Sequence, residues 1–269
     1  MIRDIHLAVT RWSVVLMALG ICHMMAAQLT AVATDTVEKH ISDLSSPNVI
    51  TRSQACQALG NTSEKDRDKA VDALVGALDD IAGTVRLAAA MALVQIGPEA
   101  RKAIPRLIEC YQKETIHPKE VVKALGRVGP NDPKAVDFLI EVVRGGRSGA
   151  VRPLSTSKPP RALRDDAIDV LAKLDPKPVK AIPVLLDVLN MAAADLVHYQ
   201  HTFSKTADAL SVIGVGDKKV AATLKRFQQG KGFKVKGKES PQLKQAILAA
   251  DSAVKRLERA NKKIADGQE

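Results

Sequence analysis

The stretch VRLAAAMALVQIG, from Val85 to Gly97, decides the fold because it returns in altered form four more times along the chain. Aligning the copies on their central leucine places that leucine at Leu59, Leu93, Leu125, Leu171 and Leu210. Successive leucines are 34, 32, 46 and 39 residues apart. A period in this range is typical of one supersecondary unit per repeat, stacked into a solenoid. The sequence therefore predicts a repeat protein.

Apolar residues recur at helical intervals within each copy, as Ala89, Leu93 and Ile96 do in the second. This spacing predicts a helix with one buried stripe. A small side chain before the central leucine permits a neighbouring helix to approach closely. The residues at that position are Ala58, Ala92, Ala124 and Ala209, with Val170 as the exception. The glycines that follow the last apolar residue are predicted to end their helices in a left-handed conformation; they are Gly97, Gly129 and Gly214.

The pattern V-R-x-x-A-x-x-A-L-x-x-I-G follows an apolar helix and an acidic turn, as in LVGALDD at Leu74–Asp80. In this arrangement it resembles the HEAT repeat, in the short form also found in bilin lyases. The resemblance covers nearly all of the chain after residue 35. It implies an all-α fold, a right-handed α-solenoid of about six HEAT-like helix pairs. It implies little about activity, since the family's pattern positions are packing positions.

The rest of the chain divides into helix pairs, each with an outer and an inner member. The predicted outer helices are Val37–Leu44, Lys69–Leu78, Arg101–Lys113, Lys134–Val143, Val179–Leu189 and Lys218–Gln229. The inner helices are the five copies of the repeated stretch and a sixth from Pro241 to about Ile264.

The first 33 residues are predicted to be an export signal and not part of the fold. Arg3 and Arg11 precede an apolar run at Ser13–Ala27, and Ala31-Val32-Ala33 offers a small-x-small cleavage site. Cleavage after Ala33 would leave residues 34–269 as the repeat domain, in the periplasm or outside the cell. An uncleaved membrane anchor is the alternative, because the 21 residues from Ser13 to Ala33 are long enough to span a bilayer.

Three connections between outer and inner helices are predicted to be longer than the rest, at residues 145–160, 190–202 and 230–240. Insertions at equivalent points of a solenoid project from one edge. Basic side chains in or next to the first and third of these connections are predicted to bind an anionic partner: Arg147, Arg152, Lys158, Arg161, Lys231, Lys234, Lys236 and Lys238. Between Lys218 and Lys263 the chain has fourteen Lys or Arg and three Asp or Glu, so the basic character is local. A solvated loop and tail that favour solubility would give the same composition.

An arginine recurs seven residues before the central leucine in three copies, at Arg52, Arg86 and Arg164. In the family that the repeat resembles, this arginine forms a ladder with acidic residues along the stack, so a structural role is expected. The alternative is a row of cations presented to an anionic ligand, against which Pro118 and Phe203 stand in the same column. The nearby acids are Asp43, Asp79, Asp80, Asp165 and Asp166.

The cysteines and histidines predict neither a redox nor a metal site. Cys56 and Cys110 lie two repeats apart, too far for a disulfide, and are expected to be buried thiols. His198 and His201 are three residues apart and share one helical face, but no third ligand has a fixed spacing from them. Surface or helix-end positions are expected for both.

No catalytic constellation, cofactor motif or phosphate-binding loop is present in the sequence. The chain is therefore expected to be an exported, non-enzymatic scaffold that binds a protein or another macromolecule as a monomer. Anionic lipid headgroups or envelope polysaccharide fit the compartment, with Phe233 and Val235 placed to enter a headgroup layer. Nucleic acid does not fit, because export and an aromatic content of 3% argue against it. The alternative function is an auxiliary protein, similar to a lyase or a chaperone, that positions a cofactor or an apoprotein.

Overall fold

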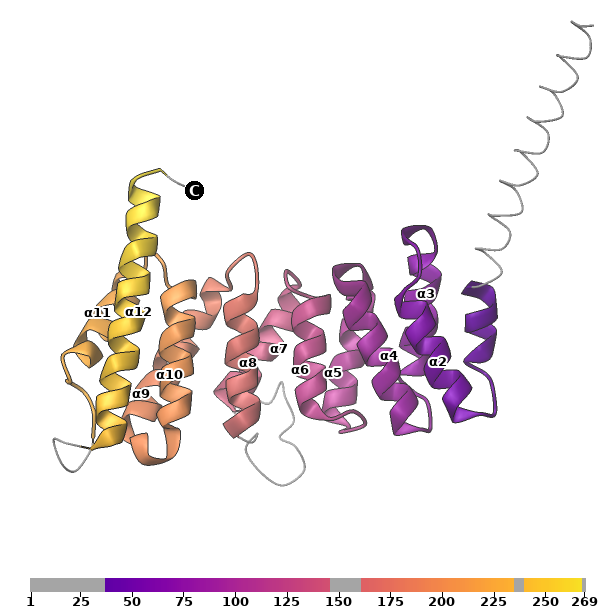
Figure 1. The fold of residues 1–269 in the computed structure, drawn as a ribbon, viewed down its shortest axis with the longest axis horizontal. Helices are drawn as coiled ribbons and strands as arrows, with labels where there is room; N and C mark the ends of the chain where they lie inside the picture. The colour runs from indigo at the N-terminus through magenta and orange to yellow at the C-terminus, as the bar shows by residue number, and fades with distance from the viewer. Residues whose placement is uncertain (1–36, 146–160, 235–239, 268–269) are drawn as a thin grey trace, which may run out of the picture.

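The structure, a computed structural model, describes residues 37–145, 161–234 and 240–267 (Figure 1). All regular elements within these ranges are helices, which confirms the all-α fold class. The predicted signal, residues 1–33, lies outside them. In the part that is described, none of the helices is both long and apolar enough to cross a membrane.

Six helix pairs follow one another along the molecule, as the repeat count predicts. The outer members are a helix at residues 37–43, α3 (Arg67–Ala77), α5 (Ile104–Gln112), α7 (Pro133–Arg144), α9 (Ile182–Ala194) and α11 (Lys218–Gln228). The inner members are α2 (Val49–Gly60), α4 (Gly83–Ile96), α6 (Pro118–Val128), α8 (Arg161–Lys173), α10 (Leu196–Ile213) and α12 (Pro241–Ala265). Short 3₁₀ turns join some of them: η1 (Glu64–Asp66), η2 (Gly97–Ala103) and η3 (Val179–Ala181).

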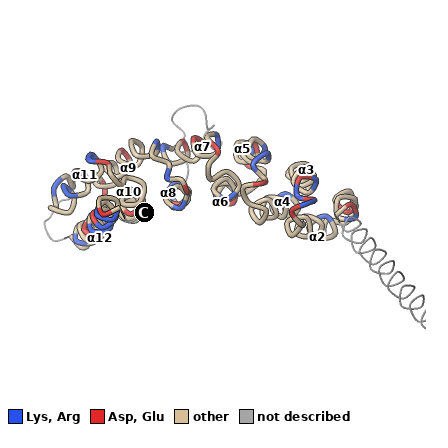
Figure 2. The backbone as a smooth tube through the Cα atoms, turned by 90° about the horizontal axis from the view of Figure 1, so that it is seen from above, with Lys and Arg blue, Asp and Glu red and all other residues tan. Residues whose placement is uncertain are grey.

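The pairs form an arc whose hollow side is lined by the inner helices (Figure 2). Each inner helix packs on the next, from α2 on α4 through to α10 on α12. The outer helices lie on the convex side, where successive members touch less extensively. Since each pair contacts mainly its neighbours, the core is a continuous layer along the stack.

The core is built from the aligned leucines. All five, from Leu59 to Leu210, are completely buried. Burying a leucine side chain stabilises the fold by roughly 1.5–3 kcal/mol. Aromatic pairs add directional contacts, and the rings of Tyr111 and Phe138 meet edge to face with centroids 4.9 Å apart. The repeated leucine is therefore the residue that joins the helix pairs into one core.

The glycines after the inner helices do not all do what the sequence predicts. Gly97 has a φ of 81°, a conformation that side chains rarely adopt. Gly129 and Gly214 have φ values of −126° and −90°, so the left-handed prediction is wrong for them. Close packing explains these two glycines. A Cβ at Gly129 would lie 2.7 Å from the Cβ of Ala135, and one at Gly214 would lie 2.7 Å from a methyl of Val220.

The insertion predicted at residues 190–202 is also wrong. Helix α9 continues to Ala194, and α10 begins at Leu196, so a single residue separates them. The extra residues lengthen the two helices, since the run Met191–Ala194 consists of strong helix formers. The helix bends at Tyr199, whose backbone is not helical.

The other two predicted insertions fall mostly outside the described residues. Helix α7 ends at Arg144 and α8 begins at Arg161, so all but the first residue of the segment 145–160 lies outside. Of the segment 230–240, residues 230–234 and 240 are described and are not helical.

Candidate binding surface

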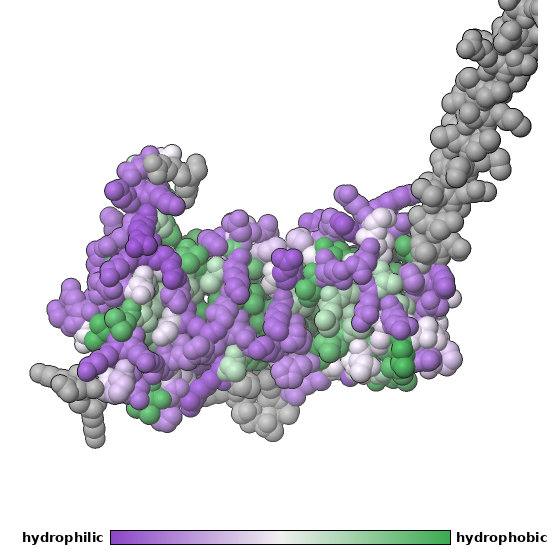
Figure 3. Space-filling model, viewed as in Figure 1, coloured by the Kyte–Doolittle hydropathy of each residue, from purple (hydrophilic) through white to green (hydrophobic). Residues whose placement is uncertain are grey.

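The six inner helices line the hollow side of the arc (Figure 2). We call the surface formed by their exposed side chains the concave face; Figure 3 views it from the front. The repeat register fixes which residues point there. One such position lies two residues before the central leucine and is occupied by Gln57, Met91, Lys123, Asp169 and Asp208. Along this position the side chains change from uncharged to charged at the third repeat.

The first part of the concave face, over α2 and α4, carries no charge on its exposed stripe. Ile50, Gln54 and Gln57 follow one another on α2, and Leu87 and Met91 on α4. In Figure 3 the hydrophobic colour gathers over these two helices. This surface was not predicted from the sequence, although Gln57 and Met91 show that the register position is uncharged in the first two repeats.

The remaining part of the concave face is charged, and its charges are paired across successive helices. Lys119 on α6 lies 3.5 Å from Asp166 on α8. Lys205 on α10 pairs with Asp169 on α8. Arg256 on α12 lies 3.2 Å from Asp208 on α10. Exposed pairs of this kind contribute about 0–1 kcal/mol each to stability. Within each of these pairs the two charges offset one another, so the pairs themselves add no net charge to the face.

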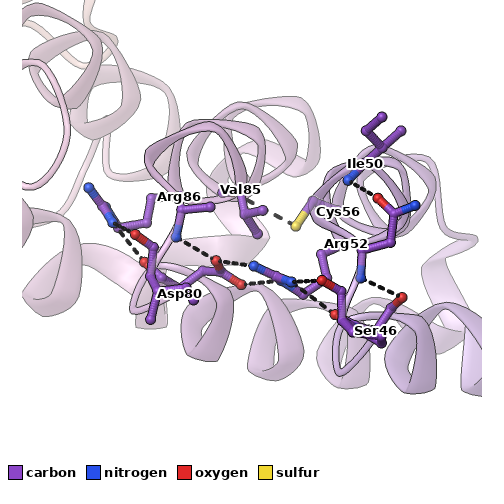
Figure 4. Close-up of polar contacts among 11 residues, drawn as sticks. Ser46, Ile50, Arg52, Cys56, Asp80, Val85 and Arg86 are labelled. Carbon is purple, nitrogen blue, oxygen red and sulfur yellow. Dashed lines mark hydrogen bonds and ion pairs between the residues drawn. The ribbon is translucent and has the colours of Figure 1, made fainter.

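The predicted arginine column begins with a two-pronged bridge between the first and second repeats (Figure 4). Nε and Nη2 of Arg52 donate to the carboxylate of Asp80 at 2.6 and 2.9 Å. Nη1 of Arg52 donates to the carbonyl of Ser46 at 2.9 Å. The hydrogen bond from Arg52 holds the pKa of Asp80 below its usual range. One side chain thus ties its own turn to the turn of the next repeat.

Arg86 repeats this geometry one unit further on, and its hydrogen-bond acceptors among the described residues are main-chain oxygens. Its Nη1 donates to the carbonyls of Asp80 and Ile81 at 2.7 and 3.0 Å. Its Nε donates to the carbonyl of Thr115 in the third repeat at 2.8 Å. These hydrogen bonds link the turns of successive repeats. The carboxylate of Asp80 accepts from Arg52, and its main-chain carbonyl accepts from Arg86.

The third member of the column, Arg164, is buried and donates from Nε to the carbonyl of Val143 at 3.0 Å. The neighbouring Asp165 is also buried, with 7% of its surface exposed. One of its carboxylate oxygens has no hydrogen-bond partner among the described residues. Burial raises the pKa of Asp165, against a smaller opposing effect of its hydrogen bond with Thr202.

One comparison with known proteins identifies the repeat in the first part of the chain. The family model for HEAT repeats matches residues 37–119, which contain the first helix pair, the second pair and the bridge between them. Residues 37–119 are HEAT repeats. The resemblance found in the sequence is confirmed there, and the helix pairs beyond residue 119 continue the same solenoid.

Two crystal structures of engineered proteins are similar to this chain. One is 18% identical with a TM-score of 0.49, and the alignment covers 83% of this chain and 97% of that chain. The other is 17% identical with a TM-score of 0.47, covering 83% of this chain and 98% of that chain. No curated protein matches the chain.

The predicted anion-binding residues are only partly described in the structure. Lys231 and Lys234 are exposed in the connection after α11. Arg161 is exposed at the start of α8, but it is engaged by α10: its Nη1 donates to the carbonyl of His198 at 3.0 Å, and its guanidinium lies 4.5 Å from the ring centroid of Tyr199. The residues that lie outside the described ranges are Arg147, Arg152, Lys158, Lys236 and Lys238.

Phe233 does not point outward, so the expectation that it enters a lipid headgroup layer is wrong. Its ring lies 5.4 Å from that of Phe203 and 5.0 Å from that of Phe227, measured between centroids. Three aromatic side chains thus pack together at the last two helix pairs, because burying the rings removes apolar surface from water. Val235, its expected companion in the headgroup layer, lies outside the described residues.

The histidines and cysteines take the positions that the sequence predicts. His198 and His201 are exposed, and Nδ1 of His198 lies 2.8 Å from a carboxylate oxygen of Asp195. Across the described ranges no three His, Cys, Asp or Glu side chains are grouped as a metal site would require. Cys56 and Cys110 are free and buried, and burial raises the pKa of Cys56 to about 11.

Proposed function

We propose that this protein is an exported, non-enzymatic HEAT-repeat scaffold that binds another macromolecule through its concave face. The observation that carries the proposal is the arrangement of the six inner helices, which line one continuous hollow surface. Such surfaces are the usual binding surfaces of solenoid repeat proteins. The partner we favour is a protein, because a long surface of regularly spaced side chains matches an extended or helical protein segment.

The connection after α11 is the part of the molecule that we expect to attract an anionic region of the partner. Lys231 and Lys234 are exposed there, and neither forms an ion pair with another described residue. The excess of basic residues between Lys218 and Lys263 makes the local field positive. Such a field mainly accelerates encounter and is screened by salt.

Export to the periplasm or beyond is the part of the proposal that depends on the sequence pattern at residues 1–33. The measurement is the N-terminal sequence of the protein recovered from the cell envelope. Cleavage after Ala33 predicts a chain that starts at Thr34. An intact N-terminus on membrane-bound protein would show the uncleaved anchor instead.

The binding proposal is tested by capture of envelope proteins on the immobilised protein at about 0.05 M and about 1 M salt, where the Debye length falls from over 10 Å to about 3 Å. Capture should weaken with salt and when Lys231, Lys234, Lys236 and Lys238 are changed together to Gln. The matched control makes the same change at four lysines elsewhere in the chain: Lys39, Lys65, Lys134 and Lys173.

The control variant should bind as the unaltered protein does. Capture that is equal at both salt concentrations and in both variants would contradict an anionic partner. Failure to capture any envelope component under either condition would contradict the scaffold itself.

A further inference from the structure

Five large apolar side chains are exposed in the first two repeats, on α2, on α4 and in the turn before α4. They are Val49, Ile50, Ile81, Leu87 and Met91, which we call the apolar corner. Ile81 is 93% exposed, Ile50 67% and Met91 61%. Nine large apolar side chains are exposed over all the described residues, so more than half of them fall within this one stretch. Figure 3 shows hydrophobic colour at the lower end and front of α2 and α4, among other places on this face.

Stacking of the repeats does not require these apolar side chains. In the repeat register, Leu87 and Met91 correspond to Lys119 and Lys123 of the next unit. Lysines therefore occupy the equivalent exposed positions of the next repeat, so the stacking does not need an apolar side chain there. Scattered apolar residues on a surface are ordinary, but a contiguous group of them marks an interaction site more often than chance.

The apolar corner is held in shape by the arginine bridge. Arg52 lies in the first turn of α2, two residues after Ile50, and donates two hydrogen bonds to the carboxylate of Asp80. Arg86 donates a hydrogen bond to the carbonyl of Ile81, in the turn that also contains Asp80. The turn that carries Ile81 is thus fixed against the first turn of α2 (Figure 4). A surface fixed before binding loses less conformational entropy when a partner docks.

The size of the apolar corner fits one face of a helix. Neighbouring helices such as α2 and α4 lie about 8–10 Å apart. A partner helix places side chains i and i+7 about 10 Å apart along its axis, since each residue rises 1.5 Å. Three apolar side chains at i, i+4 and i+7 would therefore reach from the side chains of α2 to Leu87 and Met91.

The next helix along the face supplies a positive boundary. On α6, Lys123 is paired with Glu120, and Lys119 is paired with Asp166. Arg127 is exposed on the same helix, and no ion pair to another described residue engages it. Arg127 lies four residues after Lys123, the register equivalent of Met91, so a partner helix that extends past Met91 toward the C-terminal end of α6 would approach this guanidinium. A carboxylate is the complementary group there.

We propose that the apolar corner binds an amphipathic helix of a partner protein, with its apolar stripe on α2 and α4 and acidic residues on the side that faces α6. The inference rests on the proposed scaffold function and names the chemistry of its partner. In this kind of recognition, the bound helix makes its main contacts through apolar side chains at positions i, i+4 and i+7.

The experiment selects binders from a display library of 16-residue helical peptides against the full-length protein. The stripe and its flanks are randomised in the library, and selected peptides are synthesised and titrated by fluorescence anisotropy. The variants are Ile81→Lys and Met91→Lys in the apolar corner, Arg127→Glu beside it, and Leu248→Lys as the control. Leu248 is 64% exposed on α12, so the control makes the same chemical change at the opposite end of the face.

Selected peptides should carry apolar residues at i, i+4 and i+7 and Asp or Glu on one flank. Ile81→Lys and Met91→Lys should each weaken binding at least about tenfold, Arg127→Glu about three- to tenfold, and Leu248→Lys less than twofold. All four side chains are exposed, so the variants should keep the far-ultraviolet circular dichroism of the unaltered protein.

A library that yields no binder, or binders that tolerate Ile81→Lys and Met91→Lys, would overturn the inference. The scaffold proposal is tested separately by envelope capture. If capture persists in the Ile81→Lys and Met91→Lys variants while no peptide binds the corner, the scaffold function stands and the helix-binding corner does not.

Discussion

The contact between Gly126 on α6 and Val170 on α8 gives a sharp test of how the repeats stack. Val170 stands where four other copies have alanine, and Gly126 is the residue that faces it. A Cβ added at Gly126 would lie 2.3 Å from Cγ1 of Val170. The perturbation is Gly126→Ala, made alone and together with Val170→Ala.

The expected magnitude follows from two opposing effects. Carbon atoms in contact prefer about 3.5–4.0 Å, so the added methyl must displace its neighbour. Such overpacking costs about 1–3 kcal/mol. Replacing glycine by alanine inside a helix favours folding by about 0.8–1.0 kcal/mol. Gly126→Ala should therefore destabilise the protein by about 1 kcal/mol when Val170 is present, and stabilise it by about 1 kcal/mol when residue 170 is alanine.

The assay is guanidinium unfolding followed by circular dichroism, comparing the midpoint and the free energy of unfolding across the double-mutant cycle. Gly76→Ala is the matched control, because Gly76 lies in α3 with no atom within 4 Å of an added Cβ. The control should stabilise by about 0.5–1 kcal/mol in both backgrounds. If Gly126→Ala stabilises the chain with Val170 in place, the stacking of α6 on α8 is not as described.

Three further predictions concern buried or bridged side chains. Asp165→Asn should stabilise the protein by about 1–2 kcal/mol at pH 7, because it removes a buried carboxylate with an unpartnered oxygen. The pKa of Asp165 is raised in the folded protein. The gain in stability should therefore vanish as the pH falls to about 3, where Asp165 is protonated in the folded and the unfolded protein. A gain that is independent of pH would contradict this. Asp80→Asn should have the opposite effect and destabilise the protein at pH 7, because the bridge to Arg52 is present only while the carboxylate is ionised. Below the lowered pKa of Asp80, the variant and the unaltered protein should have the same free energy of unfolding. Unfolding curves between pH 2 and pH 7 measure the effects of both substitutions. Cys56 and Cys110 should resist iodoacetamide in the native protein and react after unfolding, as read by mass spectrometry of their peptides; rapid labelling of either native thiol would show that it is exposed.

The sequence predicts the parts of this fold that repeat. The central leucines, the small residues before them and the register arginine recur at fixed spacing, and the leucines are completely buried in the structure. Local patterns are enough here because each helix pair mainly contacts its neighbours. The matching of Gly126 to Val170 has no such pattern, since it joins two different positions of consecutive repeats.

Long-range contacts explain what the sequence did not predict. The acceptor of Arg86 is the carbonyl of Thr115, and a main-chain oxygen has no signature in the sequence. Phe233 packs on Phe203 thirty residues away in the chain, although its lysine-rich surroundings indicated an exposed loop. The apolar corner combines residues of α2, the following turn and α4, so it appears only when the repeats are stacked.

The most direct test of the account is hydroxyl-radical footprinting of the protein with and without its captured envelope partner. Met91 and Leu87 lie on the concave face, and Val179 is 62% exposed in η3, beside the outer helix α9. Binding through the concave face predicts that oxidation of Met91 and Leu87 falls when the partner is bound, while oxidation of Val179 does not change. Protection of Val179 with continued oxidation of Met91 and Leu87 would contradict it.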